Sequence, residues 1–167
     1  MTKKRITALI CLIACMVMIF LFSSQNADIS GNLSEGITYK IASLTVKDFE
    51  TFSYEKQKEI VEGMHFYIRK AAHFSEYALL GVIAFLNSSL YFKKTKTRFF
   101  TTLPFCLLYA ATDEMHQLFT DGRCGSPVDV MIDFSGSVTG TVFIFIVLAV
   151  INTVRKKHDI KGDNLNH

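Results

Sequence analysis

Acidic, basic and imidazole side chains gather around one short segment of an otherwise apolar chain. The segment reads Asp113-Glu114-Met115-His116-Gln117, and more polar residues follow soon after it: Arg123, Ser126, Asp129 and Asp133. A second group lies earlier, at Arg69, Lys70, His73 and Tyr77. Carboxylates and imidazoles act as general acids and bases, and Arg and Lys hold phosphate or carboxylate groups. These residue types predict acid–base chemistry on an anionic molecule.

The candidate residues divide into two roles. We expect proton transfer or orientation from His73, Asp113, Glu114, His116 and Asp129, and substrate binding from Arg69, Lys70, Tyr77, Gln117, Arg123, Ser126 and Asp133. No covalent nucleophile stands out; Ser24 and Ser126 are the candidates. Two histidines with carboxylates also suit a metal ion, but this group has no Glu-x-x-His or His-Glu-x-x-His spacing, so metal and cofactor stay unassigned. Alternatively, pairs such as Asp113–Arg123 or Asp133–Lys70 only fix helix register.

Four apolar segments must position these residues: 6–22, 68–92, 99–119 and 128–151. At 1.5 Å per residue they span about 26 Å for the first and about 32–38 Å for the others, against about 30 Å for a bilayer core. Half of the 167 residues are apolar, aromatic or Cys. The sequence predicts one domain over 1–167, an all-α integral membrane protein built as a bundle of four transmembrane helices.

Three basic clusters indicate the orientation of the spans. They are 3–5, 93–98 and 155–161, and they hold most of the 18 basic residues and few of the 15 acidic ones. With four spans, all three clusters fall on one side, which the positive-inside rule makes cytoplasmic. Both termini are therefore expected in the cytoplasm, and topology explains these clusters better than nucleic-acid binding. The site residues and segment 23–67 then face outward.

The outer segment 23–67 is expected to be partly helical. Ile37, Ile41 and Leu44 form one apolar stripe, and a second stretch, 55–67, places Ile60, Val61, Met64 and Tyr67 on one side. Both are typical of short amphipathic helices, which we expect to cap the bundle rather than lie on the membrane surface. The polar tail 158–167 is expected to be disordered.

Several other features have ordinary explanations. The first span resembles a signal peptide, and Leu12–Cys15 a lipoprotein box, but no clear cleavage site follows Phe22 and the apolar run continues past Cys15. No disulfide framework is expected from the four cysteines. Gly81 and the pair Gly136 and Gly140 predict close packing between helices.

These motifs resemble those of the VanZ-like family of bacterial integral membrane proteins, over most of the chain. The resemblance rests on Phe22-Ser23-Ser24-Gln25 with Ser30 and Ser34 beyond, on Arg69-Lys70-x-x-His73-x-x-x-Tyr77-x-x-Leu80-Gly81, and on Asp113-Glu114-x-His116-Gln117-x-Phe119-x-x-Gly122-Arg123-x-x-Ser126-x-x-Asp129-x-x-x-Asp133-x-x-Gly136-x-x-x-Gly140. One departure is Asp133, where many members carry Asn. That departure favours a hydrogen-bonding or orienting role at this position over proton transfer.

The resemblance implies four spans in the bacterial plasma membrane and a role in the cell envelope. The founding member of the family is linked to low-level resistance to the glycopeptide teicoplanin, whereas the family implies no defined reaction. We expect a membrane-embedded hydrolase or transferase acting on an outer-leaflet lipid or lipid-linked envelope substrate. A non-catalytic binder of such a lipid, or of a lipoglycopeptide tail, is the alternative, and a transport or interaction subunit ranks last. The oligomeric state is left open.

Overall fold

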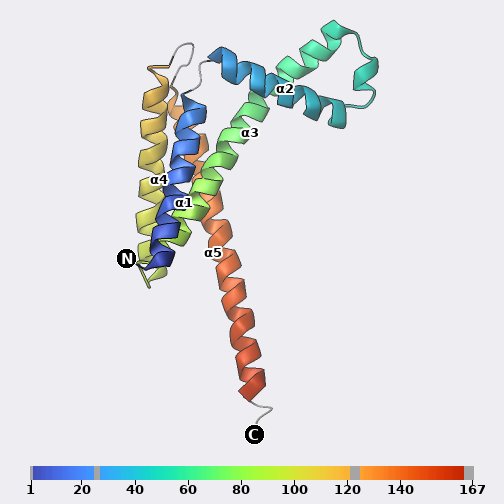
Figure 1. The fold of residues 1–167 in the computed structure, drawn as a ribbon. Helices are drawn as coiled ribbons and strands as arrows, with labels where there is room; N and C mark the ends of the chain where they lie inside the picture. The colour runs from blue at the N-terminus through green and yellow to red at the C-terminus, as the bar shows by residue number, and fades with distance from the viewer. Residues whose placement is uncertain (1, 25–26, 121–124, 164–167) are drawn as a thin grey trace.

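The chain folds into helices only, in the part that the structure describes. The computed structural model describes residues 2–24, 27–120 and 125–163, without the side chains at 27–33 and 158–163. Its elements are α1 (Lys3–Ser23), α2 (Ala27–Thr45), a short 3-10 helix η1 (Phe49–Thr51), α3 (Tyr54–Ser89), α4 (Thr95–Gln117) and α5 (Pro127–Asp163) (Figure 1). The predicted all-α class is confirmed.

Four of these helices form an elongated bundle. α1, α4, α5 and the second half of α3 run up and down alongside one another, and α5 continues well past the other helices at its C-terminal end (Figure 1). α3 packs against α1, α4 and α5, and its contact with α5 is the most extensive in the described part of the chain. The expected spans 6–22 and 128–151 lie within α1 and α5, whereas 68–92 and 99–119 extend past the ends of α3 and α4 by two or three residues. Two of them, α1 and the Pro127–Lys157 part of α5, are long and apolar enough to cross a membrane.

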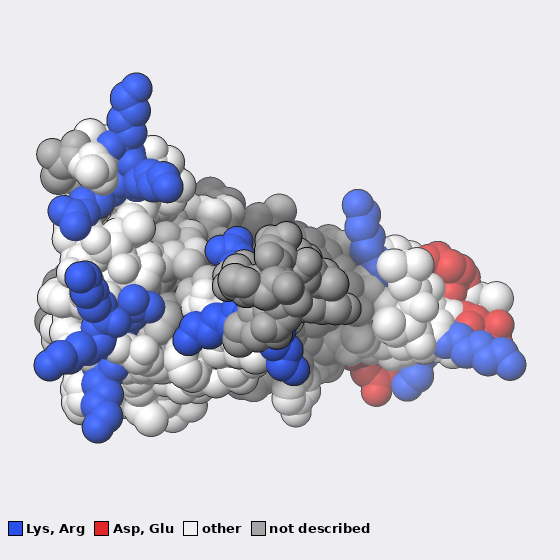
Figure 2. Space-filling view, turned by 90° about the horizontal axis from the view of Figure 1, so that it is seen from below, with Lys and Arg blue, Asp and Glu red and all other residues white. Residues whose placement is uncertain are grey.

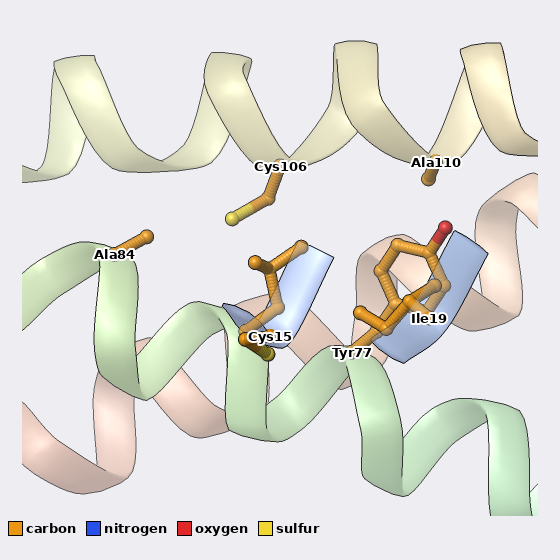
Figure 3. Packing of buried hydrophobic residues seen from close by; sticks show 7 residues of the cluster. Cys15, Ile19, Tyr77, Ala84, Cys106 and Ala110 are labelled. Atoms are coloured by element: carbon orange, nitrogen blue, oxygen red, sulfur yellow. The ribbon is translucent and has the colours of Figure 1, made fainter. Parts of the chain in front are cut away.

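Small side chains let three of the helices approach closely. Seven buried residues from α1, α3 and α4 form the core of the bundle: Cys15, Ile19, Tyr77, Leu80, Ala84, Cys106 and Ala110. Figure 3 labels all of them but Leu80 and shows their side chains between the three helices. Tyr109 on α4 adds a polar tie, because its hydroxyl donates a hydrogen bond of 2.6 Å to the Met16 carbonyl of α1. Small residues at helix contacts and such interhelical bonds are typical of membrane bundles.

Large apolar side chains cover much of the outside of the bundle. Ile10 is 59% exposed, Leu108 67% and Phe143 62%, on α1, α4 and α5 respectively. Soluble monomers rarely show contiguous apolar surfaces of this kind, whereas helices in lipid must expose them. This surface and the two long apolar helices indicate a membrane protein.

Glycines bring α3 and α5 into backbone contact. A Cβ atom added at Gly81 would overlap the carbonyl group of Ser137, and one at Gly140 would overlap that of Ala78. The close approach allows two interhelical hydrogen bonds: the Ser137 hydroxyl donates to the Tyr77 carbonyl at 3.2 Å, and the Thr141 hydroxyl donates to the Gly81 carbonyl at 3.3 Å. The packing role predicted for these glycines is confirmed.

The segment between α1 and the bundle part of α3 differs from the prediction. α2, η1 and the first half of α3 form an arm that projects sideways from one end of the bundle (Figure 1). The expected cap is therefore wrong. The stretch 55–67 is also not a separate helix, because α3 runs without a break from Tyr54 to Ser89.

The arm has its own small core, and its buried face was only partly predicted. Val61 on α3 is buried against Ala42 and Phe49, with Ile60 and Met64 packed beside them. The predicted α2 stripe is not the buried face: Leu44 is 86% exposed and Ile37 48%. Ala42 is fully buried instead, because a small side chain lets α2 lie closer to α3.

The C-terminal tail also differs from the prediction. We expected disorder from residue 158, but α5 continues as a helix to Asp163.

Candidate functional site

Polar residues from four helices meet at one end of the bundle, here called the polar end. The C-terminal ends of α1 and α4, the start of α5 and the middle of α3 all reach it (Figure 1). The polar cluster comprises Ser23, Ser24, Arg69, Lys70, His73, Asp113, Glu114, His116, Gln117, Ser126, Asp129 and Asp133. The expected site residues that the structure describes lie on α3, on α4 and around the first turns of α5, and α1 adds Ser23 and Ser24 as a fourth element.

The contact between α3 and α5 carries one ion pair and one contact between a histidine and an aspartate. Lys70 Nζ forms an ion pair with Asp129 Oδ1, and both side chains are about three-quarters buried. One helical turn further along both helices, His73 Nδ1 lies 4.0 Å from Asp133 Oδ1. Lys70 and His73, three residues apart on α3, lie on one helix face, and both contact α5. The alternative Asp133–Lys70 pair does not form, because Lys70 meets Asp129.

Asp113 lies at the centre of the cluster, where α1, α3 and α4 meet. It is 4% exposed, and Gln117 Nε2 donates a hydrogen bond of 3.4 Å to its Oδ2. The hydroxyl groups of Ser23 and Tyr77 lie beside the same carboxyl, and Figure 3 shows the Tyr77 hydroxyl directed towards α4. Tyr77 is fully buried, so it reaches a substrate only through Asp113 in this structure.

His116 joins α4 to the end of α1. Its Nε2 atom lies 3.1 Å from Ser24 Oγ, and its ring packs on Phe20 with 4.7 Å between centroids. The Ser24 hydroxyl also lies 2.6 Å from the Phe20 carbonyl, so its proton has two possible acceptors. A serine hydroxyl and an imidazole nitrogen at this distance can act as a nucleophile and its general base.

Glu114 and Ser126 fix the beginning of α5. The backbone N–H of Ser126 donates to Glu114 Oε2 at 2.9 Å, and the Ser126 hydroxyl accepts a bond of 3.2 Å from the Val128 N–H. This is the geometry of a helix N-cap, with Pro127 at the favoured first position. Asp129 in the first turn of α5 is favourable there because the helix N-terminus is electropositive. These contacts hold Asp129 and Asp133 toward α3.

The cluster holds four carboxyl groups, and two of them have oxygens without a hydrogen-bond partner among the described residues. Asp133 is 1% exposed, and neither of its carboxyl oxygens has a hydrogen-bond partner among the described residues. Asp113 Oδ1 likewise has no hydrogen-bond partner among the described residues. Four other carboxyl groups act electrostatically on Asp133: Glu76, Asp113, Glu114 and Asp129. Buried acceptors of this kind are costly unless a donor or a cation satisfies them.

A small cavity opens beside Asp133. Its volume is about 20 Å³, and Arg69, Lys70, His73, Gln117 and Asp129 also line it. That is room for about one water molecule. Arg69 forms no ion pair with any residue in the described ranges, so its guanidinium is available for an anion at the cavity.

Ser23 is the member of the cluster that sequence reasoning did not assign. Its position in the motif Phe22-Ser23-Ser24-Gln25 is the sequence signal for it, but only Ser24 of this motif is a predicted candidate nucleophile. Arg123, expected to hold substrate, lies outside the described residues, as does Cys124. Among the residues that the structure describes, no group of three or more His, Cys, Asp and Glu side chains is arranged to hold a metal ion.

Comparison with known proteins identifies a family for most of the chain. The model of the family described as VanZ/LLP1 matches residues 8–149, which include most of α1, all of α4 and every residue of the polar cluster. No curated protein and no solved structure matches the chain significantly.

Proposed function

The chain belongs to the VanZ/LLP1 family, and we propose that it is a multi-pass protein of the bacterial plasma membrane with four spans and both termini in the cytoplasm. The spans are the apolar parts of α1, α3, α4 and α5. The polar end of the bundle then faces outward. The opposite end, here called the basic end, faces the cytoplasm.

The basic end supports this orientation. Figure 2 looks at that end and shows Lys and Arg side chains gathered around it, whereas the acidic side chains visible in this view lie on the arm. Arg5 at the start of α1 donates a hydrogen bond of 3.1 Å to the Leu90 carbonyl after α3, and its guanidinium lies 4.9 Å from the centre of the Tyr91 ring. Two basic clusters far apart in sequence therefore lie together, as the positive-inside rule requires.

Cysteine labelling in intact cells tests the orientation. In a variant without native cysteines, Glu59→Cys on the arm will react with a membrane-impermeant maleimide in intact cells. Lys93→Cys, in the link between α3 and α4, will react only after the membrane is permeabilised. Both positions are exposed, so accessibility alone does not separate them. Labelling of Lys93→Cys in intact cells would overturn the four-span arrangement.

We propose further that the polar cluster is the active site of a membrane-embedded hydrolase or transferase. The observation that carries this proposal is the 3.1 Å contact between Ser24 Oγ and His116 Nε2. Ser24 would attack the electrophilic carbon or phosphorus of the substrate, and His116 would accept the serine proton. As the bond to the leaving oxygen breaks, His116 returns that proton to it. Water, or a second alcohol in a transferase, then releases the group from Ser24 by the reverse steps.

The remaining groups define the substrate. Arg69 suits an anionic group, with bidentate contact to phosphate or carboxylate. The carboxyl oxygens of Asp113 and Asp133 that lack a hydrogen-bond partner among the described residues suit hydroxyl or amino groups of a substrate, because these groups would donate the missing hydrogen bonds. A lipid or lipid-linked envelope molecule with a phosphate and a hydroxyl- or amine-bearing head combines both features. Its tails would lie against the exposed apolar faces of the helices.

Conversion of envelope lipids tests the catalytic proposal. We expect purified protein in nanodiscs, supplied with a total bacterial lipid extract, to deplete one anionic lipid class and to form a product with a matching mass difference. The readout is mass spectrometry over time, with empty nanodiscs as the control. An unchanged lipid profile would count against catalysis.

A specific observation also favours the alternative, a non-catalytic binder. The charge of Lys70 is already neutralised by Asp129. Arg69 and the Asp133 carboxyl, whose oxygens have no hydrogen-bond partner among the described residues, could bind a lipid head group or a lipoglycopeptide without reaction. Either function fits a contribution to teicoplanin resistance in a Gram-positive host, which we include in the proposal. The two differ in their dependence on Ser24.

A further inference from the structure

A second groove lies at the basic end, far from the polar cluster. It opens between the start of α1 and the end of α3 and has a volume of about 670 Å³. Its lining includes Lys3, Lys4, Ala8 and Cys11 from α1 and Ile83 and Asn87 from α3. The small side chains of Ala8 and Cys11 leave this space, while the Arg5 contact with Leu90 holds the ends of the two helices together.

Two features of the groove point to a ligand. Asn87 is 8% exposed, and its Nδ2 amide has no hydrogen-bond partner in the described part of the chain. Leaving a buried donor unsatisfied is costly, so an acceptor is expected beside it. Lys3 and Lys4 form no ion pairs with residues of the described ranges, and their positive charges stand at the same groove.

The chemistry of the groove matches one class of molecule. Two free ammonium groups suit a phosphate, the amide donor suits a phosphate or ester oxygen, and the apolar part of the lining suits an acyl chain. The basic end is cytoplasmic in the orientation proposed above. We propose that this groove binds an anionic phospholipid of the cytoplasmic leaflet, with its phosphate at Lys3 and Lys4 and an acyl chain along Ala8, Cys11 and Ile83. This proposal rests on the four-span orientation but not on catalysis at the polar cluster.

Lipid-dependent stabilisation tests the proposal in detergent. Phosphatidylglycerol will raise the melting temperature of the purified full-length protein, whereas phosphatidylcholine and inorganic phosphate will not. Lys3→Gln with Lys4→Gln will weaken phosphatidylglycerol binding by about fivefold for each lysine, since one basic residue near a charged lipid surface contributes about that factor. Lys93→Gln with Lys94→Gln removes the same charge from the same end outside the groove and will leave binding unchanged.

Asn87→Leu keeps the size of the side chain and removes the amide. Because the buried donor is unsatisfied without a ligand, this variant will be as stable as the unmodified protein or more stable in lipid-free detergent. Its response to phosphatidylglycerol will nevertheless be weaker. Native mass spectrometry will show the same order, with less retained phosphatidylglycerol in Asn87→Leu and in the Lys3 and Lys4 variant.

Each other outcome overturns the proposal. Equal binding of phosphatidylcholine would show that the head group is irrelevant. Equal stabilisation by inorganic phosphate would assign the groove to a soluble anion. An equal loss of phosphatidylglycerol binding in the Lys93 and Lys94 variant would show that the effect comes from general surface charge. If the four-span orientation itself is wrong, the labelling of Lys93→Cys in intact cells will show it independently.

Discussion

Replacing His116 with alanine will lower conversion of the lipid substrate by about 10²–10⁴-fold, the range in which a general base contributes. Ser24→Ala will reduce it at least as much, because the proposed nucleophile is gone. The two residues act as a unit across the 3.1 Å contact, so the double variant will be no slower than the worse single one. The measurement is the rate of product formation in nanodiscs, with teicoplanin susceptibility of a Gram-positive host as a second readout.

Ser75→Ala provides a matched control. Ser75 on α3 is exposed, and its hydroxyl bonds the carbonyl four residues earlier, Ala71, just as Ser24 bonds Phe20. The same group is therefore lost from the same helical setting without touching the polar cluster. Ser75→Ala will keep full activity and membrane level.

The binder alternative predicts the reverse dependence. Ser24→Ala would then preserve the resistance phenotype, because no bond to serine is formed. Arg69→Ala would abolish it, because the anionic head would lose its partner. Retained turnover in Ser24→Ala would exclude Ser24 as the nucleophile, whatever the effect of His116→Ala.

The sequence was sufficient to predict the helical class and the long helices of the bundle, but not the helices and buried faces of the arm. Apolar runs of bilayer length indicate the long helices in the bundle, and the i, i+3 spacing of Lys70 and His73 places both on the α3 face that meets α5. Side-chain pairs between helices were harder to predict, because they depend on how one helix is rotated against another. By sequence alone Lys70 could pair with Asp133 or Asp129, and in the structure it pairs with Asp129.

Two further differences have similar physical causes. No proline lies between Ser53 and the bundle half of α3, and Gly63 alone does not break a helix, so the arm and the bundle share α3. On α2, hydrophobicity predicted that Leu44 would be buried, whereas the smaller Ala42 is the residue that packs in the core of the arm. The contact of Ser24 with His116 joins residues 92 positions apart, which no local pattern reveals.

Gly140→Ala will destabilise the protein more than any surface substitution. The added methyl group would overlap the Ala78 carbonyl, and a backbone carbonyl cannot swing aside as a flexible side chain can. α3 and α5 must therefore separate, at a cost of about 1–3 kcal/mol for overpacking. The neighbouring bond from Thr141 to the Gly81 carbonyl will weaken as well. Thermal unfolding in detergent measures the loss.

Gly63→Ala is the matched control for Gly140→Ala. Gly63 lies in the arm half of α3, and a Cβ atom there meets no other atom within 4 Å. The alanine variant should therefore be neutral, or more stable by about 0.5–1 kcal/mol from helix propensity. Because the same two helices carry the Lys70–Asp129 and His73–Asp133 pairs, Gly140→Ala will also lower activity, whereas Gly63→Ala will not. Equal stability of both variants would show that α3 and α5 are not in backbone contact.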